Sequence, residues 1–172
     1  CRGFAAGFSK KQLAELALKD IYDNSLTLLY RLLFVFYAEA RELLPLTSSL
    51  SYYDNYSMHK ITHDIDEVIR KGQPLSSQST IYYQRIGNLF GWINTGDPDL
   101  GVPEYNGGLF DPEEHPFLEE QAIADTHLVP AIQQLAQVYD KELKRVVTVD
   151  YNTLSERHLG SIYEGLLEFK PR

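Results

Sequence analysis

The fold is decided by one stretch of the sequence, LLYRLLFVFY, which spans residues 28–37. Its residues are apolar on nearly every side of a helix, and Arg31 is its one charged member. A helix that is apolar all round is usually the buried centre of a bundle. The stretch is too short to cross a membrane, because a membrane-spanning helix needs about 20 apolar residues. We therefore expect an acidic, mostly helical domain built around this segment.

Apolar residues recur at helical spacing along most of the remaining chain, which predicts further helices around the central one. Residues 47–55 are polar and rich in Ser and Tyr, so we expect a loop there, and the only credible strand is 146–149. The sequence thus predicts an all-α fold, an irregular bundle of about 5–6 helices with at most one short strand pair, in a single domain over residues 1–172. The expected helices cover residues 9–20, 26–44, 58–70, 80–93, 126–143 and 153–169, with one helical turn at 117–121.

Local patterns indicate where these helices begin and end and which side they bury. Ser9 with Gln12, and Thr153 with Glu156, have the spacing of a capping box. Pro45 should end the helix over residues 26–44. The other candidate caps are Asp23, Asn24 or Ser25 for that same helix, and Asp125 or Thr126 for the helix over 126–143. The inward-facing residues are expected to be Ile61, Ile65, Val68 and Ile69 in one helix, and Ile81, Ile86, Leu89, Phe90 and Ile93 in the next.

Residues 96–114 form the longest predicted loop, with four Gly and three Pro. Loops beyond about 12–15 residues are uncommon unless they have a function. Inside it, Asn106, Gly107 and Gly108 are expected to make a tight turn, because two consecutive glycines reach positive φ at little cost. We expect either a turn pinned to the bundle or an anchor that docks a neighbouring domain, and both are structural roles. The flanking side chains that could fill a groove are Tyr105, Leu109 and Phe110.

The negative charge of the chain is concentrated in one block. The formal net charge is -8, yet residues 86–140 hold ten Asp or Glu and neither Lys nor Arg. Affinity for DNA phosphates comes largely from Lys and Arg, so this block should face away from DNA or pack on protein. The lone Cys1 cannot form an internal disulfide, so nothing indicates secretion, and the expected location is the cytoplasm.

Two groups of residues have partial metal-site spacing. His59 and His63 lie at i and i+4 on a predicted helix, with Asp66 one turn further, but a third ligand at a recognisable spacing is missing. We interpret them as a solvated helix face. Residues 97–101, DPDLG, begin like a calcium loop, but the third oxygen ligand is missing and Pro98 breaks the spacing. A plain acidic turn is the expected structure.

Catalytic and nucleic-acid motifs give no positive indication either. Ser161 and His158 lie within a predicted helix and not on the strand-to-helix elbow of a hydrolase, so a catalytic triad is rejected. The sequence contains no glycine-rich phosphate loop. Bases could stack on the tyrosines, but such sites need interleaved Lys or Arg, and only Lys60 and Arg85 are near. The tyrosines concerned are Tyr52, Tyr53, Tyr56, Tyr82 and Tyr83, which we expect at the edge of the core.

Three segments together resemble a known family. They are LYRLLFVFYAEAR (residues 29–41), VPEYNGGLFD (102–111) and HLGSIYEGLLE (158–168). In order and rough spacing they are similar to the helical region that precedes the methyltransferase domain of type IIG restriction-modification enzymes, in which one polypeptide cuts and methylates DNA. In the last segment, Gly160 and Gly165 would each cost a helix about 1 kcal/mol relative to Ala, which indicates close packing by another helix or domain. Tyr163 and Glu164 belong to the same candidate docking surface.

The resemblance implies a connector and places no catalytic residue on this chain. A PD-D/E-x-K nuclease and an adenine-specific methyltransferase with an Asn-Pro-Pro-Tyr/Phe motif would lie elsewhere in the polypeptide, and neither signature occurs here. We therefore expect part of a larger polypeptide, without a cofactor of its own, since SAM and Mg belong to the other domains. The expected partners are those neighbouring domains, with weak or no DNA contact by this chain and no membrane. The alternatives are a free-standing acidic interaction module, such as a DNA mimic, and a small metal-dependent hydrolase that uses the acidic loop.

Overall fold

The computed structural model describes residues 1–6, 18–105 and 107–167. It confirms the all-α class, because helices dominate and the only sheet among the described residues is one antiparallel strand pair. The helices are α1 (Arg2–Ala6), α3 (Leu18–Ala40), α4 (Leu50–Asn55), α5 (Met58–Arg70), α6 (Ile81–Thr95), α7 (Pro116–Glu120), α8 (Asp125–Ala136) and α9 (Glu156–Leu167). Two short 3-10 turns, η1 (Gly108–Phe110) and η2 (Tyr151–Thr153), and the strands β1 (Gln137–Asp140) and β2 (Arg145–Thr148) complete the list.

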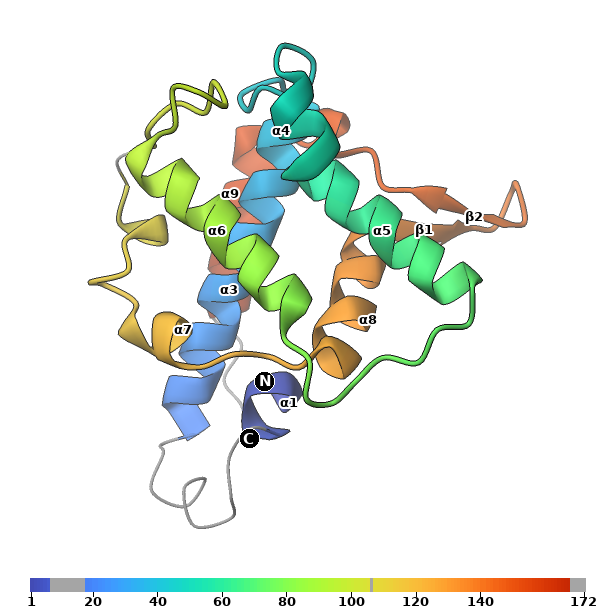
Figure 1. Ribbon diagram of the computed structural model, residues 1–172, viewed down its shortest axis with the longest axis horizontal. Coiled ribbons are helices and arrows are strands. Elements are labelled where there is room, and N and C mark those ends of the chain that lie inside the picture. Colours follow the sequence, from blue (N-terminus) through green and yellow to red (C-terminus); the bar gives the residue numbers. More distant parts are fainter. Residues whose placement is uncertain (7–17, 106, 168–172) are drawn as a thin grey trace.

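Helix α3 runs through the middle of the molecule, as its apolar sequence predicts (Figure 1). Val35 and Ala38 are fully buried, and one hydrophobic cluster extends from them to α5, α6 and α8. The expected inward residues of α5 and α6 are buried except Val68, Ile69 and Ile81. Ile69 and Ile81 are exposed because they lie at the last and first turns of their helices, beyond the neighbouring elements.

The expected start and end of the central helix were wrong. It begins by Leu18 and passes through the three residues proposed as its caps. Asn24 and Ser25 donate instead to carbonyls one turn earlier, at 2.8 and 2.6 Å, which satisfies their side chains inside the helix. The helix ends at Ala40, before Pro45, because Glu42 adopts a φ of 57° and Leu43 N–H closes back on the Ala38 carbonyl at 2.8 Å.

Two segments were assigned to the wrong class. Residues 50–55, expected as loop, form α4, where the Ser49 side chain accepts from Tyr52 N–H and Tyr52 is fully buried. Residues 137–140, expected as the end of a helix, form β1 and pair with β2, so that Val138 lies opposite Val147. Pairing with residues 145–148 overrides helical spacing here, and Val138 and Val147 suit a paired strand because they are β-branched. The hairpin projects from the body (Figure 1).

Several capping residues act differently from the prediction. Ser155, rather than Thr153, caps α9 by accepting from His158 N–H at 3.2 Å. The residue before α8 is Ala124, whose methyl group cannot accept a hydrogen bond, and Asp125 is already the first residue of the helix. The Oγ1 of Thr126 is buried without a partner. Ser9 and Gln12 lie outside the described residues.

Buried carboxylates from distant elements cap two helices instead. Glu39 of α3 accepts from the Met58 and His59 N–H groups at the start of α5, at 2.6 and 3.0 Å. Asp125 of α8 accepts from Tyr82 N–H at the start of α6, at 3.2 Å, and from the Ser79 hydroxyl. Both side chains are about 95% buried. Carboxylates at helix N-termini are stabilised by the free N–H groups and the helix dipole.

Candidate functional site

The Gly/Pro-rich loop is held on the bundle by the three side chains expected to anchor it. Tyr105 donates its hydroxyl to the Leu43 carbonyl at 2.6 Å and meets the Phe34 ring edge-on. Phe110 is buried, with its ring 5.2 Å from that of Phe34 and 5.4 Å from that of Phe90. Tyr105 and Phe110 therefore hold this part of the loop against α3 and α6.

Arg31 ties the same loop to α3 from inside the core. Its Nε donates to the Leu109 carbonyl at 2.7 Å, and its guanidinium lies over the rings of Phe90 and Phe110 at 5.4 and 5.8 Å. Glu119 approaches one terminal nitrogen at 3.5 Å, while the other terminal nitrogen is buried without a partner. Burial lowers the pKa of Arg31, and the negative charge of Glu119 opposes this effect. Arg31, the one charged residue of the apolar stretch, therefore makes specific contacts with Leu109 and Glu119.

The glycine pair does not form the expected left-handed turn. Gly107 is extended, with φ -138° and ψ 136°, and Gly108 begins η1; Asn106 lies outside the described residues. The loop instead has its positive φ angles at Gly96 and Gly101, which lie on either side of residues 97–100. A Cβ at Gly108 would lie 2.9 Å from Cδ of Glu114, whose exposed and flexible side chain would have to move aside.

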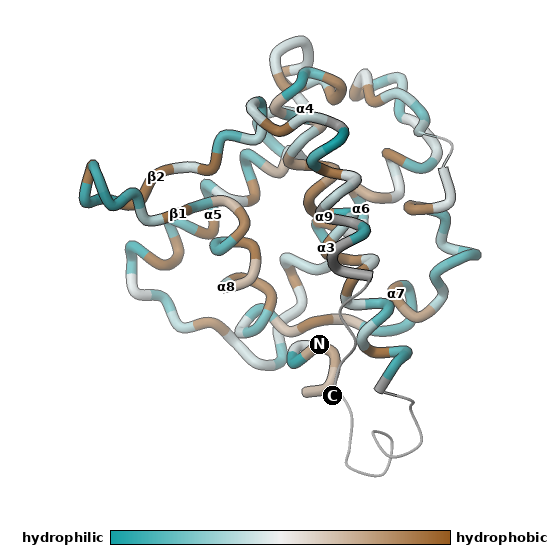
Figure 2. The backbone as a smooth tube through the Cα atoms, turned by 180° about the vertical axis from the view of Figure 1, so that it is seen from behind, coloured by the Kyte–Doolittle hydropathy of each residue, from teal (hydrophilic) through white to brown (hydrophobic). Residues whose placement is uncertain are grey.

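A pocket of about 820 Å³ opens between α3, the 108–115 segment and α9. It joins parts of all three segments that carry the family resemblance, because α3, Leu109 and Gly160 form its walls. Helix α9 lies behind α3 in Figure 1 and in front of it in Figure 2, which is seen from behind. The lining residues are Asp23, Leu26, Thr27, Tyr30, Phe34, Tyr37, Leu43, Gly108, Leu109, Glu114, His115, Leu159 and Gly160.

The walls and the rim of the pocket differ in character. Leu26, Tyr30 and Tyr37 are buried along α3 and provide apolar and aromatic surface. Asp23 and Glu114 are exposed carboxylates from opposite sides. Among the described lining residues there is neither Lys nor Arg. The pocket is therefore apolar inside and negative at its edge.

Residues of α9 that were singled out in the sequence are only partly brought to this site. Gly160 lines the pocket, and a Cβ there would meet nothing within 4 Å, so no contact among the described residues requires its glycine. Glu164 is exposed. The surroundings of Tyr163 and Gly165 lie outside what the structure describes.

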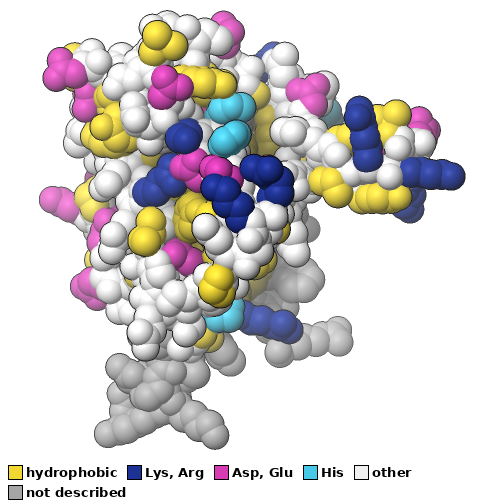
Figure 3. Space-filling model, turned by 45° about the vertical axis from the view of Figure 1, so that its right-hand side comes forward, with side chains coloured by type: hydrophobic (Ala, Val, Ile, Leu, Met, Phe, Trp, Pro, Cys, Tyr) yellow, Lys and Arg dark blue, Asp and Glu magenta, His cyan; other side chains and the backbone are white. Residues whose placement is uncertain are grey.

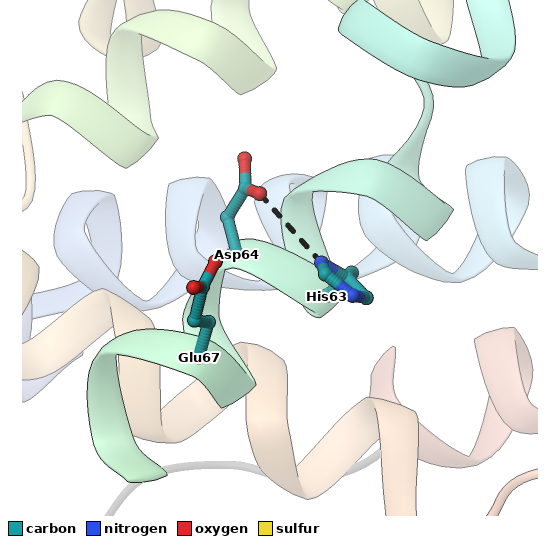
Figure 4. Close-up of side chains that lie close together, drawn as sticks. All are labelled: His63, Asp64 and Glu67. Carbon is teal, nitrogen blue, oxygen red and sulfur yellow. Dashed lines mark ion pairs between the residues drawn. The ribbon is translucent and has the colours of Figure 1, made fainter. Parts of the chain in front are cut away.

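The candidate metal ligands on α5 are engaged elsewhere. His59 bonds to the Tyr53 hydroxyl at 3.0 Å, and Asp66 accepts from Gln137 at 2.8 Å, so neither joins His63. His63 lies instead near Asp64 and Glu67, with their ligand atoms within 4.8 Å of one another (Figure 4). Glu67 lies four residues after His63 and three after Asp64, and both spacings bring side chains together on a helix.

Cations already neutralise the two carboxylates of this group. Asp64 pairs with Lys60 at 2.8 Å and with Arg85 at 2.9 Å, and Glu67 pairs with Lys71 at 2.6 Å. Burial would raise the pKa of Asp64, but its contacts with Lys60 and Arg85 outweigh burial and hold the pKa below its usual value. Lys and Arg side chains flank the acids on this face (Figure 3). The group is better explained as an ion-pair network between α5 and α6 than as a metal site.

The remaining candidates adopt structural roles. Asp97 accepts from Leu100 N–H at 2.9 Å, as in a plain acidic turn, and Ser161 donates to the Arg157 carbonyl within α9. Tyr52 and Tyr82 are buried and Tyr83 donates to the Leu118 carbonyl, which matches a role at the core edge. Tyr53 and Tyr56 are the more exposed pair and pack against His59 and Trp92.

No helix within the described ranges combines the length and apolar character needed to cross a bilayer. No protein-family model, curated protein or solved structure matches this chain.

Proposed function

We propose that this chain is a structural connector of a DNA restriction-modification polypeptide. It would hold a nuclease module and a SAM-dependent adenine methyltransferase module at a fixed separation, in the cytoplasm. The observation that carries the proposal is the meeting of the three resembling segments. Arg31 of the first bonds to Leu109 of the second, and Leu159 of the third lines the same pocket as Leu109.

A connector fixes the relative positions of the domains that it joins, so it should be rigid where its segments meet. The Arg31 contact crosses 78 residues of sequence and is partly buried, and Tyr105 adds an exposed bond to the Leu43 carbonyl, just after α3. The Arg31 side chain itself is buried, so breaking its bond would leave a buried donor without a partner, which favours one arrangement. The absence of a nuclease or methyltransferase motif in the sequence fits a role in positioning.

The alternative of a DNA mimic has less support. A mimic needs a continuous surface of unpaired acids, whereas several members of the acidic block serve the fold. Asp125 is buried as a helix cap, Glu119 faces Arg31 and Asp97 closes a turn. The metal-dependent hydrolase has less support again, since Asp97 is used by its own turn.

The reading frame that encodes this chain provides the test. We expect it to continue into an Asn-Pro-Pro-Tyr or Asn-Pro-Pro-Phe motif, and the complete polypeptide to methylate adenine in duplex DNA when SAM is added. The isolated chain should neither bind SAM in calorimetry nor methylate DNA. A frame that lacks the motif, or micromolar SAM binding by the isolated chain, would overturn the proposal.

A further inference from the structure

We propose that the pocket between α3, the 108–115 segment and α9 binds a small organic cation with an aromatic or otherwise apolar body. This inference is independent of the connector proposal, because it rests on the shape and charge of the pocket alone. Its volume, about 820 Å³, lies in the range of small-molecule sites, which is roughly 300–1,000 Å³.

The inner wall provides the surface for the apolar body. Tyr30, Phe34 and Tyr37 lie at i, i+4 and i+7 on α3, so their side chains fall on one face of the helix. Leu109 and Leu159 close the pocket from the loop and from α9. Aromatic rings attract cations through the negative charge on their faces, and the effect is strongest where water is excluded. The Tyr37 ring already has a cation over it, because the Arg41 guanidinium lies 5.7 Å from its centroid, so the preference for a cation over an anion of equal size rests on the rest of the wall and on the acidic rim.

The rim provides the charge. Asp23 and Glu114 place two carboxylates at the edge of the pocket. Arg31 also belongs to α3, but its guanidinium lies over Phe90 and Phe110, and it does not line the pocket. Glu114 lies against Gly108, where any larger residue would displace it. An anion would be repelled at this edge, and a neutral ligand would gain nothing from it.

The test uses two ions of the same shape and opposite charge. Tetraphenylphosphonium and tetraphenylborate are titrated separately into the full 172-residue chain by calorimetry at low salt. We expect saturable one-to-one binding of the phosphonium, weakened by added salt, and at least tenfold weaker binding of the borate. Equal affinity for the two ions, or no saturable binding of the phosphonium, would overturn the proposal.

Matched variants locate the binding site. Asp23→Asn and Glu114→Gln should each weaken phosphonium binding about two- to fivefold, as expected for ion pairs at an exposed rim. Glu113→Gln changes the neighbouring exposed acid outside the lining and should have no effect. Gly160→Leu should abolish binding without lowering the melting temperature, because there is open space at this helical glycine. Retained binding in Gly160→Leu, or equal losses in Glu113→Gln and Glu114→Gln, would show that the ion binds elsewhere.

Discussion

The carboxylate of Glu39, near the end of α3, accepts the backbone N–H of Met58, the first residue of α5, at 2.6 Å. Tyr52 of α4 donates its hydroxyl to the same oxygen at 2.7 Å, and His59 N–H binds the other oxygen. One buried acid therefore joins three helices.

This acid should make stability depend on pH. Burial raises the pKa of Glu39 from 4.5 to about 7, although the hydrogen bonds from Tyr52, Met58 and His59 oppose the shift. The folded chain then holds a proton that the unfolded chain releases near pH 4.5, so the contribution of Glu39 to stability is greatest below that pH. It falls as pH rises to about 7, by roughly 3 kcal/mol from the size of the shift. Urea unfolding at several pH values measures this loss.

Glu39→Gln is the variant that isolates the effect. Glutamine cannot ionise, so the stability advantage of the parent chain over this variant should shrink between pH 4.5 and 7. Glu42→Gln, an exposed position just after the same helix, is the control and should leave the pH profile unchanged. A constant difference between the parent and Glu39→Gln across this range would contradict the prediction.

Arg31 should contribute more through its bond to Leu109 than through its ion pair. Arg31→Met keeps apolar bulk but leaves the Leu109 carbonyl without its donor, which should cost about 1–3 kcal/mol. Glu119 is about half exposed, so Glu119→Gln should cost about 0.5 kcal/mol or less. Thermal melts of the two variants measure these losses, because each kcal/mol of unfolding free energy shifts the melting midpoint by roughly 2–4 °C. Equal losses would assign the stabilisation to the ion pair.

The sequence predicts the helices whose signals are local. Apolar spacing predicts α5, and the apolar run centred on Val35 identifies α3 as the core helix. It cannot predict caps that come from elsewhere in the fold. Glu39 lies 19 residues before the helix that it caps, and Asp125 lies 43 residues after Tyr82.

The candidate site was also only partly predictable, because some of its contacts come from distant parts of the chain. Tyr105 and Phe110 could be identified as anchors, because large aromatic residues beside glycines in a loop need somewhere to pack. The role of Arg31 could not be identified, because nothing in the sequence indicates which carbonyl a lone Arg in an apolar run will bond. The second strand agrees with the strand expected at 146–149, but the first was missed for a related reason: residues 137–140 become a strand only through pairing with 145–148.

Asp125 and Thr126 are adjacent but should respond in opposite ways. Asp125→Ala removes the acceptor for Tyr82 N–H and for Ser79, and should cost about 1–3 kcal/mol. Thr126→Val replaces a buried hydroxyl that has no partner with a methyl of similar size, so stability should stay equal or rise by up to about 1 kcal/mol. Chemical denaturation measures both. A destabilised Thr126→Val would mean that its hydroxyl has a partner, such as a buried water.

Duplex DNA should bind this chain weakly. The acidic block opposes phosphate contact, and the three exposed cations of the hairpin, Lys141, Lys144 and Arg145, lie beside Asp140 and Glu142. We expect a dissociation constant weaker than about 1 µM in a gel shift at physiological salt. Replacing Lys141, Lys144 and Arg145 with Ser should remove most of the residual binding. Sub-micromolar affinity, or binding unaffected by this triple change, would contradict the prediction.

Two glycines of the same loop provide the sharpest test of its backbone. Gly96 has a φ of 72°, and a Cβ there would lie 3.1 Å from the Glu104 nitrogen. Gly107 is extended, with open space where a Cβ would lie. A β-branched residue is strained in the left-handed region and at ease in the extended one, because its second branch crowds the backbone only in the former. Gly96→Val should therefore cost about 1–3 kcal/mol or more.

Gly107→Val should stay within about 0.5 kcal/mol of the parent chain, since its backbone suits valine and no neighbour is displaced. Thermal melts of the two variants, with Glu113→Val as a solvent-exposed reference in the same loop, give the comparison. If Gly107→Val melted as early as Gly96→Val, the backbone at 107 would have to visit positive φ, and the turn would be the left-handed one that its glycine pair suggests. If neither variant changed the melting temperature, the loop would not be held against α3, and the Tyr105 and Leu109 bonds would contribute nothing to stability.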